Sequence, residues 1–233
     1  MTDSTTSGSA LVIGASRGLG LALVAEYLDR GWQVTATVRG AARTGLHDLA
    51  DASGGRLTVE EVDIAVPEQV TALRERIGDR KFDLLFVNAG ITQGDVPVGD
   101  VTTESFTEVM ITNALSPMRV VEAFQDVVPP TGTIGVMSSR QGSVSLNTNG
   151  GHEVYRASKS ALNQLMRSFA ARHADDPRTL LLMCPGWVRT GLGGPGALLS
   201  IEESIPAVVD TIGKQAGLGG LHYLDREGQT LPW

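Results

Sequence analysis

Short apolar runs alternate with amphipathic stretches along nearly the whole chain. Parallel strands that are covered on both faces form continuous apolar runs, and they are joined by helical crossovers. The alternation therefore predicts an α/β protein built on a parallel sheet. Seven runs have the length of a strand, at residues 10–13, 33–38, 57–62, 82–87, 133–137, 179–184 and, more weakly, 221–224.

The amphipathic stretches between these runs predict crossover helices, and no repeat or linker interrupts them. We expect one domain over residues 10–233, preceded by a flexible polar tail at 1–9. A glycine-rich segment at 191–196 follows the sixth run, so we expect a small substrate loop near 191–201. Proline suits a first helical turn, as at Pro67, and acidic side chains favour the same end. The expected helices begin near Leu19, Pro67, Thr103, Glu153 and Glu202.

Charge and cysteine content narrow the classes of partner. The net charge is −7 and the isoelectric point is about 5.1, which argues against nucleic acid or an anionic membrane and favours small molecules. The single cysteine, Cys184, rules out an internal disulfide and suits a reducing cytoplasm. The four histidines show no paired ligand spacing, so we expect no metal site. Among the histidines, His152 is a candidate for the substrate site, because it precedes Tyr155 closely enough to border the opening of that site.

The first apolar run leads into a glycine loop at residues 14–20, and a helix follows directly. Glycines allow the tight turn and close backbone approach that a pyrophosphate needs at a helix start. The spacing Gly14-x-x-x-Gly18-x-Gly20 predicts nucleotide binding rather than an ordinary strand-to-helix turn.

The end of the second run indicates which dinucleotide is bound. The residues there include Arg39 but no carboxylate that would bind the ribose hydroxyls of NAD. Together with Arg17 in the glycine loop, Arg39 can hydrogen-bond a 2′-phosphate, which favours NADP. Arg43 is a third candidate for binding the same phosphate. The alternative is that these arginines are solvated surface residues.

Tyr155 and Lys159 are four positions apart, which places them one turn apart on one face of a helix. A nearby cation favours the phenolate and lowers the pKa of a phenol, so Tyr155 is a candidate general acid. Taken alone, the pair would more commonly be a half-buried ring beside a solvated amine. The remaining motifs change that balance.

With these motifs, the chain resembles the short-chain dehydrogenase/reductase superfamily over nearly its whole length. The glycine loop, Asp63, the segment 88–90, the serine segment 137–142 and the segment 185–190 occur in the expected order. The gap between Ser139 and Tyr155 and the final residues 228–233 are similar to the carbonyl-reductase subgroup of sniffer and C-factor-like proteins. One departure is Val87, which stands where the family usually has the first of two asparagines.

The resemblance implies a Rossmann-type doubly wound sheet of seven parallel strands in the order 3-2-1-4-5-6-7. It also implies hydride transfer from NADP(H) to a carbonyl carbon. Ser139 would polarise the carbonyl, Tyr155 would deliver the proton, Lys159 would hold the nicotinamide ribose and lower the pKa of the phenol, and Asn113 would hold a relay water. Cofactor contacts are expected at Gly14, Ser16, Arg17, Gly18, Leu19, Gly20, Arg39, Asp63, Ile64, Asn88, Ala89, Gly90, Tyr155, Lys159, Pro185, Gly186, Val188 and Thr190.

Two functions remain from the sequence. The first is a cytoplasmic NADPH-dependent oxidoreductase, a carbonyl reductase or alcohol dehydrogenase, that reversibly reduces a small aldehyde or ketone. The second is a C-factor-like nucleotide-binding signalling or sensing protein with incidental turnover. Retention of Asn113, Ser139, Tyr155 and Lys159 favours the enzyme, because a sensor needs only the loop and the arginines. The family contains monomers and homo-oligomers, so both assembly states remain open.

Overall fold

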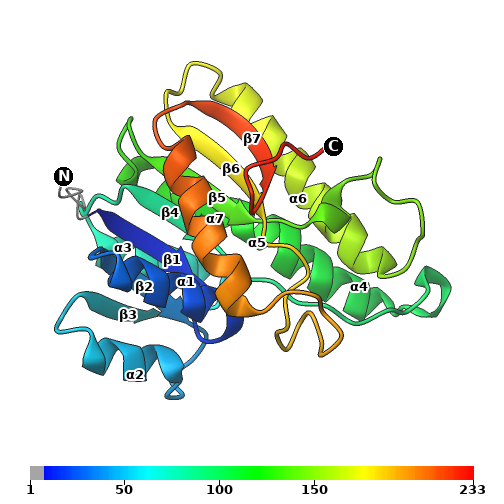
Figure 1. The fold of residues 1–233 in the computed structure, drawn as a ribbon, viewed down its shortest axis with the longest axis horizontal. Coiled ribbons are helices and arrows are strands. Elements are labelled where there is room, and N and C mark those ends of the chain that lie inside the picture. The colour runs from blue at the N-terminus through cyan, green and yellow to red at the C-terminus, as the bar shows by residue number, and fades with distance from the viewer. Residues whose placement is uncertain (1–7) are drawn as a thin grey trace.

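A computed structural model describes residues 8–233 and contains one sheet of seven parallel strands (Figure 1). The spatial order is β3-β2-β1-β4-β5-β6-β7, which confirms the predicted doubly wound topology. The order reverses between β1 and β4, and open sheets of this kind bind ligands beside such a point. The strands are β1 (Ser9–Ile13), β2 (Gln33–Val38), β3 (Leu57–Glu61), β4 (Leu84–Val87), β5 (Thr133–Met137), β6 (Thr179–Cys184) and β7 (Gly220–Asp225).

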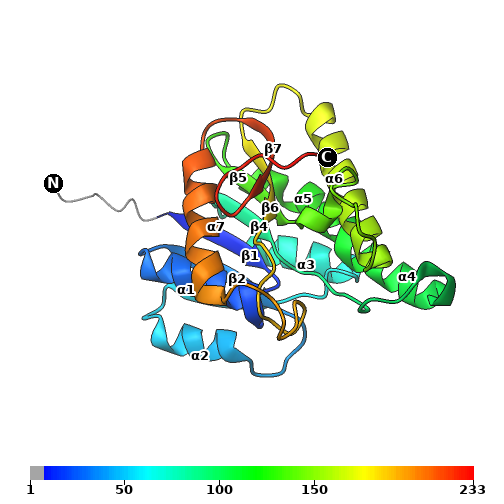
Figure 2. The ribbon, with the colours of Figure 1, turned by 45° about the vertical axis from the view of Figure 1, so that its right-hand side comes forward.

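Helices cover both faces of the sheet, as the two views in Figures 1 and 2 show. Helices α1, α2 and α7 pack on one face, whereas α3, α5 and α6 pack on the other. The helices are α1 (Gly18–Asp29), α2 (Gly45–Ala52), α3 (Pro67–Ile77), α4 (Thr103–Met110), α5 (Ser116–Phe124), α6 (Glu153–Arg172) and α7 (Ile201–Gln215). Short 3-10 turns are η1 (Val98–Asp100), η3 (Gln125–Val127) and η4 (Arg140–Gly142), and η2 (Ile111–Leu115) is a π-helical turn.

The sheet separates two hydrophobic clusters. On one face, side chains of α1 and α7 such as Leu23 and Val208 pack against alternate residues of the strands. On the other, side chains of α3, α5 and α6 such as Leu73, Phe124 and Phe169 do the same. Each strand in the middle of the sheet contributes to both clusters, which explains why its sequence is apolar throughout.

The structure departs from the predicted limits of β1, β3, β4 and β7 by one or two residues, and it adds helix α2. Helix α2 was not predicted, because it is only eight residues long; Leu46 is buried, and Leu49 and Ala50 are partly buried against the core. Strand β1 begins one residue inside the predicted tail, where the Ser9 backbone N–H donates to the Asp83 carboxylate at 2.8 Å. Strand β4 begins at Leu84 rather than at residue 82, and the Phe82 N–H donates outside the sheet to the Val127 carbonyl at 2.9 Å. The rest of the predicted tail, residues 1–7, lies outside the described residues.

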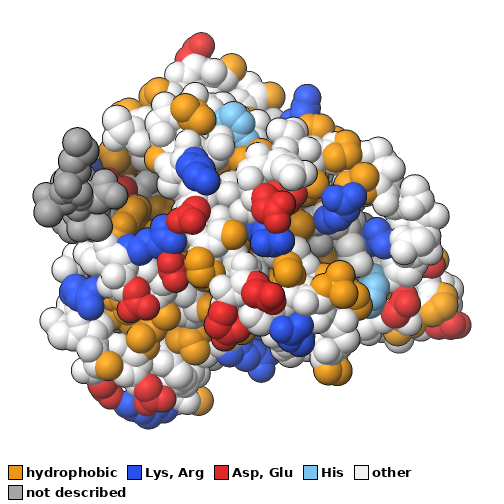
Figure 3. Space-filling model, viewed as in Figure 1, with side chains coloured by type: hydrophobic (Ala, Val, Ile, Leu, Met, Phe, Trp, Pro, Cys, Tyr) orange, Lys and Arg blue, Asp and Glu red, His pale blue; other side chains and the backbone are white. Residues whose placement is uncertain are grey.

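The surface bears acidic and basic side chains in mixture on the face drawn in Figure 3, without separation into fields of one sign. This mixture agrees with a chain whose modest negative charge is spread over many residues. Within residues 8–233, no helix is both long enough and apolar enough to cross a membrane.

Gly135 on β5 provides a test of how tightly the sheet packs. A Cβ at this position would come within 2.6 Å of the Phe86 ring on the neighbouring strand β4. We expect Gly135→Ala to lower the free energy of unfolding by about 1–3 kcal/mol in urea titrations, the usual cost of overpacking a core. Adding Phe86→Leu should recover part of the loss.

Gly213→Ala is the matched control, because it places a methyl group on the exposed side of helix α7, where the new Cβ has no atom within 4 Å. It should raise the free energy of unfolding by about 0.5–1 kcal/mol. A neutral Gly135→Ala would mean that the contact with Phe86 is looser than the structure indicates.

Candidate active site

Four of the predicted motifs follow the carboxyl ends of strands. The glycine loop follows β1, segment 88–90 follows β4, Ser139 follows β5 and segment 185–190 follows β6. Because these four strands are neighbours and parallel, their following loops meet at one edge of the sheet (Figure 1). Residues separated by more than 100 positions in sequence therefore surround one location.

The glycine loop is folded tightly against the end of β4. The Asn88 side-chain amide donates to the Gly14 carbonyl at 2.9 Å, and a Cβ on Gly14 would come within 2.9 Å of Ala89. A Cβ on Gly20 would lie 2.1 Å from the Gly14 carbonyl oxygen, which excludes any other residue at that position without rearrangement. Helix α1 begins at Gly18 without a side-chain cap, so the amides of its first turn face the loop.

Val87 replaces the family's first asparagine without loss of this geometry. Its side chain is buried in the cluster beneath α5, with 1% of its surface exposed. Asn88 holds the glycine loop from the end of β4, and Thr37 of β2 holds it from the other side by accepting the Gly14 N–H at 3.0 Å. The departure from the family pattern therefore adds apolar packing where a polar side chain is usual.

The arginines proposed for a 2′-phosphate differ in their availability. Arg17 and Arg39 are exposed, and neither has an ion-pair partner among residues 8–233. Arg43 instead pairs with Asp48 at 2.7 Å and with Asp51 at 2.5 Å. Its guanidinium is occupied by α2, so the structure gives no support to Arg43 as a third contributor.

Two predicted cofactor contacts, Asp63 and Ile64, follow β3. The Asp63 carboxylate accepts the Ala65 backbone N–H at 2.9 Å, which fixes the turn into α3. The Ile64 side chain is buried in the hydrophobic core. Only its main chain is therefore placed to meet a ligand.

Ser139 opens the turn η4 directly after β5. Its Oγ accepts the Gln141 backbone N–H at 3.1 Å, which leaves the hydroxyl hydrogen available to donate. The Tyr155 hydroxyl, near the start of α6, lies close enough to the Ser139 hydroxyl for that group to lower the pKa of the phenol. The two hydroxyl groups thus meet although sixteen residues separate them in sequence.

Lys159 is buried beside a half-buried Tyr155 ring, so the interpretation of a solvated amine is wrong. Lys159 has 3% of its surface exposed, and its Nζ lies 5.8 Å from the centroid of the Tyr155 ring. The ammonium donates to the Met137 carbonyl at 2.9 Å. Burial lowers the pKa of Lys159 to about 8.

The expected lowering of the phenol pKa is not found in the protein alone. Burial raises the pKa of Tyr155 to about 12, and the nearby Ser139 hydroxyl offsets only part of that rise. The cost of desolvating a phenolate exceeds the attraction of an ammonium several ångströms from the ring. Tyr155 is therefore protonated at neutral pH, which is the form that a proton donor requires.

Asn113 is fully buried in the π-helical turn η2, and its side chain is already committed. Its Oδ1 accepts the Ile91 N–H at 2.8 Å, while its Nδ2 donates to the Ile91 carbonyl at 2.8 Å and to Ser158 Oγ at 3.0 Å. The amide thereby joins the loop after β4 to α6. The structure shows a bracing role, and the relay-water role stays a prediction.

The segment after β6 forms a small bridged loop. Val188 pairs with Leu199, and the backbone bond from Arg189 N–H to the Leu199 carbonyl measures 2.9 Å. Gly186 has a φ of +86°, and the Pro185 carbonyl accepts the buried Ser204 hydroxyl at 2.7 Å. The Thr190 side chain approaches Gly18, where a Cβ would lie 3.8 Å away. Thr190 of segment 185–190 and Gly18 of the glycine loop therefore face one another.

His152 has a left-handed backbone, with a φ of +48°, the only positive value at a non-glycine residue in 8–233. Its N–H donates to Asp95 Oδ1 at 2.6 Å, and in return Glu153 Oε2 accepts the Val98 N–H at 2.9 Å. These reciprocal bonds fasten the loop after β4 to the start of α6. No sequence pattern points to Asp95, since its partner is 57 residues away.

A family model described as short chain dehydrogenase matches residues 9–195. The chain belongs to this family. A solved Burkholderia multivorans short-chain dehydrogenase/reductase with bound NADP is 55% identical, with a TM-score of 0.96, and the match covers 97% of this chain and all of that one.

The resemblance to the sniffer and C-factor subgroup is also confirmed. The solved carbonyl reductase Sniffer of D. melanogaster is 28% identical, with a TM-score of 0.88 over 97% of this chain and all of that chain. The C-signal protein of Myxococcus xanthus is 33% identical over 156 residues, which span 65% of this chain and 92% of that protein. The family assignment is consistent with hydride-transfer chemistry at the site described above.

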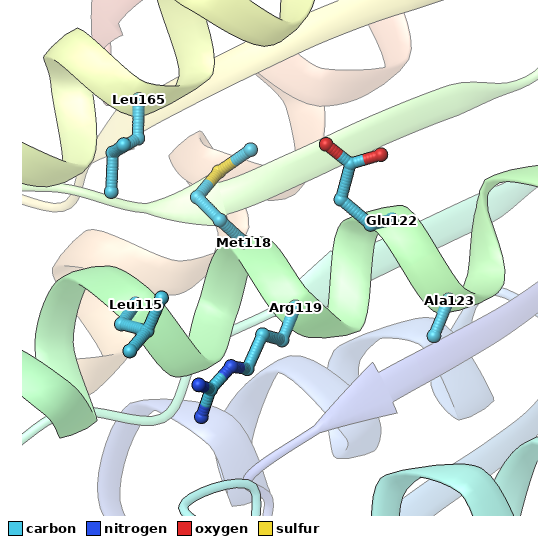
Figure 4. Close-up of a pocket in the computed structure, with 6 residues that line it drawn as sticks. All are labelled: Leu115, Met118, Arg119, Glu122, Ala123 and Leu165. Atoms are coloured by element: carbon cyan, nitrogen blue, oxygen red, sulfur yellow. The ribbon is translucent and has the colours of Figure 1, made fainter. Parts of the chain in front are cut away.

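A separate apolar groove lies on the outer face of α5 and α6 (Figure 4). Leu115 of η2 and Met118 of α5 lie toward Leu165 of α6, and Glu122 borders them while pairing with Arg172. None of these residues belongs to the family motifs found in the sequence. The groove is therefore distinct from the candidate active site.

Lys159→Met should stabilise the cofactor-free protein at neutral pH. A folded-state pKa of about 8, below the ordinary 10.5, means that the unfolded chain binds this proton more tightly, so stability rises between pH 8 and 10.5. The difference corresponds to roughly 3 kcal/mol, offset by about 1 kcal/mol for the lost hydrogen bond to Met137. We expect a net gain of about 1–2 kcal/mol at pH 7.

Urea unfolding at pH 7, 8, 9 and 10 measures this effect, and the gain should vanish as the pH approaches 10.5. Lys214→Met on the exposed surface of α7 is the control and should change little at any pH. A Lys159→Met protein that is less stable at pH 7 would contradict the inferred cost of the buried charge.

Proposed function

We propose that the protein is an NADPH-dependent oxidoreductase that reduces a small aldehyde or ketone to an alcohol, reversibly. The observation that carries this proposal is the meeting of two hydroxyl groups, from Ser139 and Tyr155, beside the buried ammonium of Lys159. A carbonyl oxygen placed against both hydroxyls would find two donors. The carbonyl-reductase title of the similar Sniffer protein supports the same reaction class.

The residues present fit a nicotinamide dinucleotide. A cradle with no room for a Cβ at Gly14 or Gly20 faces the uncapped first turn of α1, which suits a pyrophosphate. Arg17 and Arg39 are free to bind a 2′-phosphate, as the NADP in the Burkholderia protein supports. Val188 and Thr190 lie across from the glycine loop, where a nicotinamide end would be held.

When bound, the reduced nicotinamide supplies the hydride. As negative charge grows on the carbonyl oxygen, the Ser139 hydroxyl stabilises it by donating a hydrogen bond. Tyr155 then transfers its phenolic proton to that oxygen, for which it is already in the protonated form. Lys159 lowers the cost of the phenolate left behind and orients ribose hydroxyls with its remaining donors.

A signalling or sensing protein is the second candidate, favoured by the similarity to the C-signal protein. Nucleotide sensing requires the glycine loop and the arginines but not a desolvated ammonium. Burying Lys159 costs stability, as its lowered pKa shows. A cost of this kind is expected where chemistry requires it, so the enzyme is the better proposal. Location in the cytoplasm stays a prediction from the sequence.

Tyr155→Phe tests the reaction directly, because it removes the hydroxyl and keeps the ring. We expect NADPH-dependent reduction of a panel of aldehydes and ketones to fall by at least ~10²-fold, with fold and NADPH affinity retained. Absorbance of NADPH at saturating carbonyl substrate gives kcat, and fluorescence titration gives the cofactor Kd. Near wild-type turnover in a folded Tyr155→Phe protein would leave the sensing function as the better account.

Cofactor preference tests the two free arginines. Arg39→Ala should weaken NADPH binding by about 1.5–3 kcal/mol, the strength of one charge-assisted contact, and leave NADH binding almost unchanged. Arg43→Ala is the matched control, because that guanidinium is already paired with two aspartates. If the two variants lose NADPH affinity equally, or if the wild type prefers NADH, the assignment to Arg39 is wrong.

A further inference from the structure

Tyr223 contacts the catalytic segment from the far end of the chain. It lies in the middle of β7, has 1% of its surface exposed, and donates its hydroxyl hydrogen to the carbonyl of Ser139. Eighty-four residues separate the two in sequence. No sequence motif pointed to this tyrosine.

The accepting carbonyl determines how the Ser139 side chain is aimed. The same oxygen accepts the Gly142 N–H at 2.8 Å, so the tyrosine and the turn η4 occupy both of its acceptor positions. Ser139 Oγ is in turn held by the Gln141 N–H within that turn. A rotation of the Ser139 peptide would break these bonds together and redirect the hydroxyl.

Helix α6 holds the same segment from the other side. The Ser138 hydroxyl donates to Asn163 Oδ1 at 2.6 Å, and Asn163 Nδ2 donates to the Gly142 carbonyl at 3.2 Å. Further along, the Trp233 carbonyl accepts the Ser145 hydroxyl at 2.8 Å, and the Trp233 ring lies 5.5 Å from that of Tyr223. The segment from Ser138 to Ser145 is thus fastened between α6 and the chain that follows β6.

The Tyr223 hydroxyl remains protonated, and so remains a hydrogen-bond donor, over the pH range in which the protein would work. Burial raises the pKa of Tyr223 to about 12, so its hydroxyl keeps its hydrogen. The hydroxyl is committed to a backbone oxygen rather than to the reacting groups, which distinguishes it from Tyr155.

We propose that Tyr223 is a positioning residue that aims the Ser139 hydroxyl at the substrate carbonyl. The inference rests on the proposed reductase function and deepens it. It assigns to the last strand of the sheet a part in polarising the substrate.

Tyr223→Phe removes the hydroxyl and keeps the ring beside Trp233. We expect kcat for carbonyl reduction to fall about tenfold, since small misplacements of a catalytic group are costly. The Kd for NADPH should be unchanged, because the glycine loop is untouched. Tyr27→Phe is the matched control: Tyr27 is equally buried, but its hydroxyl has no partner among residues 8–233, so kcat should not change.

A double-mutant cycle with Ser139→Ala separates positioning from a general structural effect. If Tyr223 acts through Ser139, adding Tyr223→Phe to Ser139→Ala should cost no further activity. The same tenfold loss in both backgrounds would overturn the proposal. Replacing Tyr223 with 4-aminophenylalanine, which restores a donor at that ring position, should recover kcat even if the Phe variant folds poorly, and failure to recover would also overturn it.

An activity assay of the wild-type protein distinguishes failure of the proposed function from failure of the positioning role. A wild-type protein that reduces no carbonyl compound overturns the proposed function and the positioning role with it. An active wild type with an unaffected Tyr223→Phe variant overturns the positioning role alone.

Discussion

The buried ammonium of Lys159 connects the chemistry of this protein to its fold. Its bond to the Met137 carbonyl joins α6 to the end of β5, the strand that leads into Ser139. The Gly90 backbone is also close, since a Cβ there would lie 3.5 Å from Nζ. A charge removed from water requires a fixed hydrogen-bond partner, and the last residue of β5 supplies one. The site is therefore organised around the buried Lys159 ammonium, whose removal from water costs free energy.

Two asparagines make that organisation possible by linking loops that the sheet brings together. Asn88 joins the end of β4 to the glycine loop, and Asn113 joins the loop after β4 to α6. An amide side chain can donate and accept at once, so each residue satisfies backbone groups that would otherwise be unpaired at strand ends. The nucleotide half and the catalytic half are thus fastened to the same strand.

The sequence predicted the elements whose signal is local and continuous. Strands β2, β5 and β6 have the predicted limits, and nearly all of their residues are buried. Helix α2 was missed because it is short and only Leu46 is fully buried, and the π-helical turn around Asn113 has no sequence signature. The motifs follow strand ends or lie on α6, and the roles of their residues stay predictions.

What the sequence could not provide was the environment of each group. The raised pKa of Tyr155 follows from burial, the pairing of Arg43 from the position of α2, and the contact of Tyr223 from the register of β7. Each depends on residues far away in the chain. Distances and desolvation of this kind arise only when the sheet has formed.

The division of the core into two clusters bears on how such a protein can change over time. The cluster beneath α1 and α7 supports the nucleotide half, and the cluster beneath α5 and α6 supports the helix that carries Tyr155 and Lys159. Side chains on opposite faces of the sheet share few partners, so their substitutions should combine nearly additively. New substrate preferences can therefore accumulate on one face while the other keeps its hold on the dinucleotide, which makes this architecture readily evolvable.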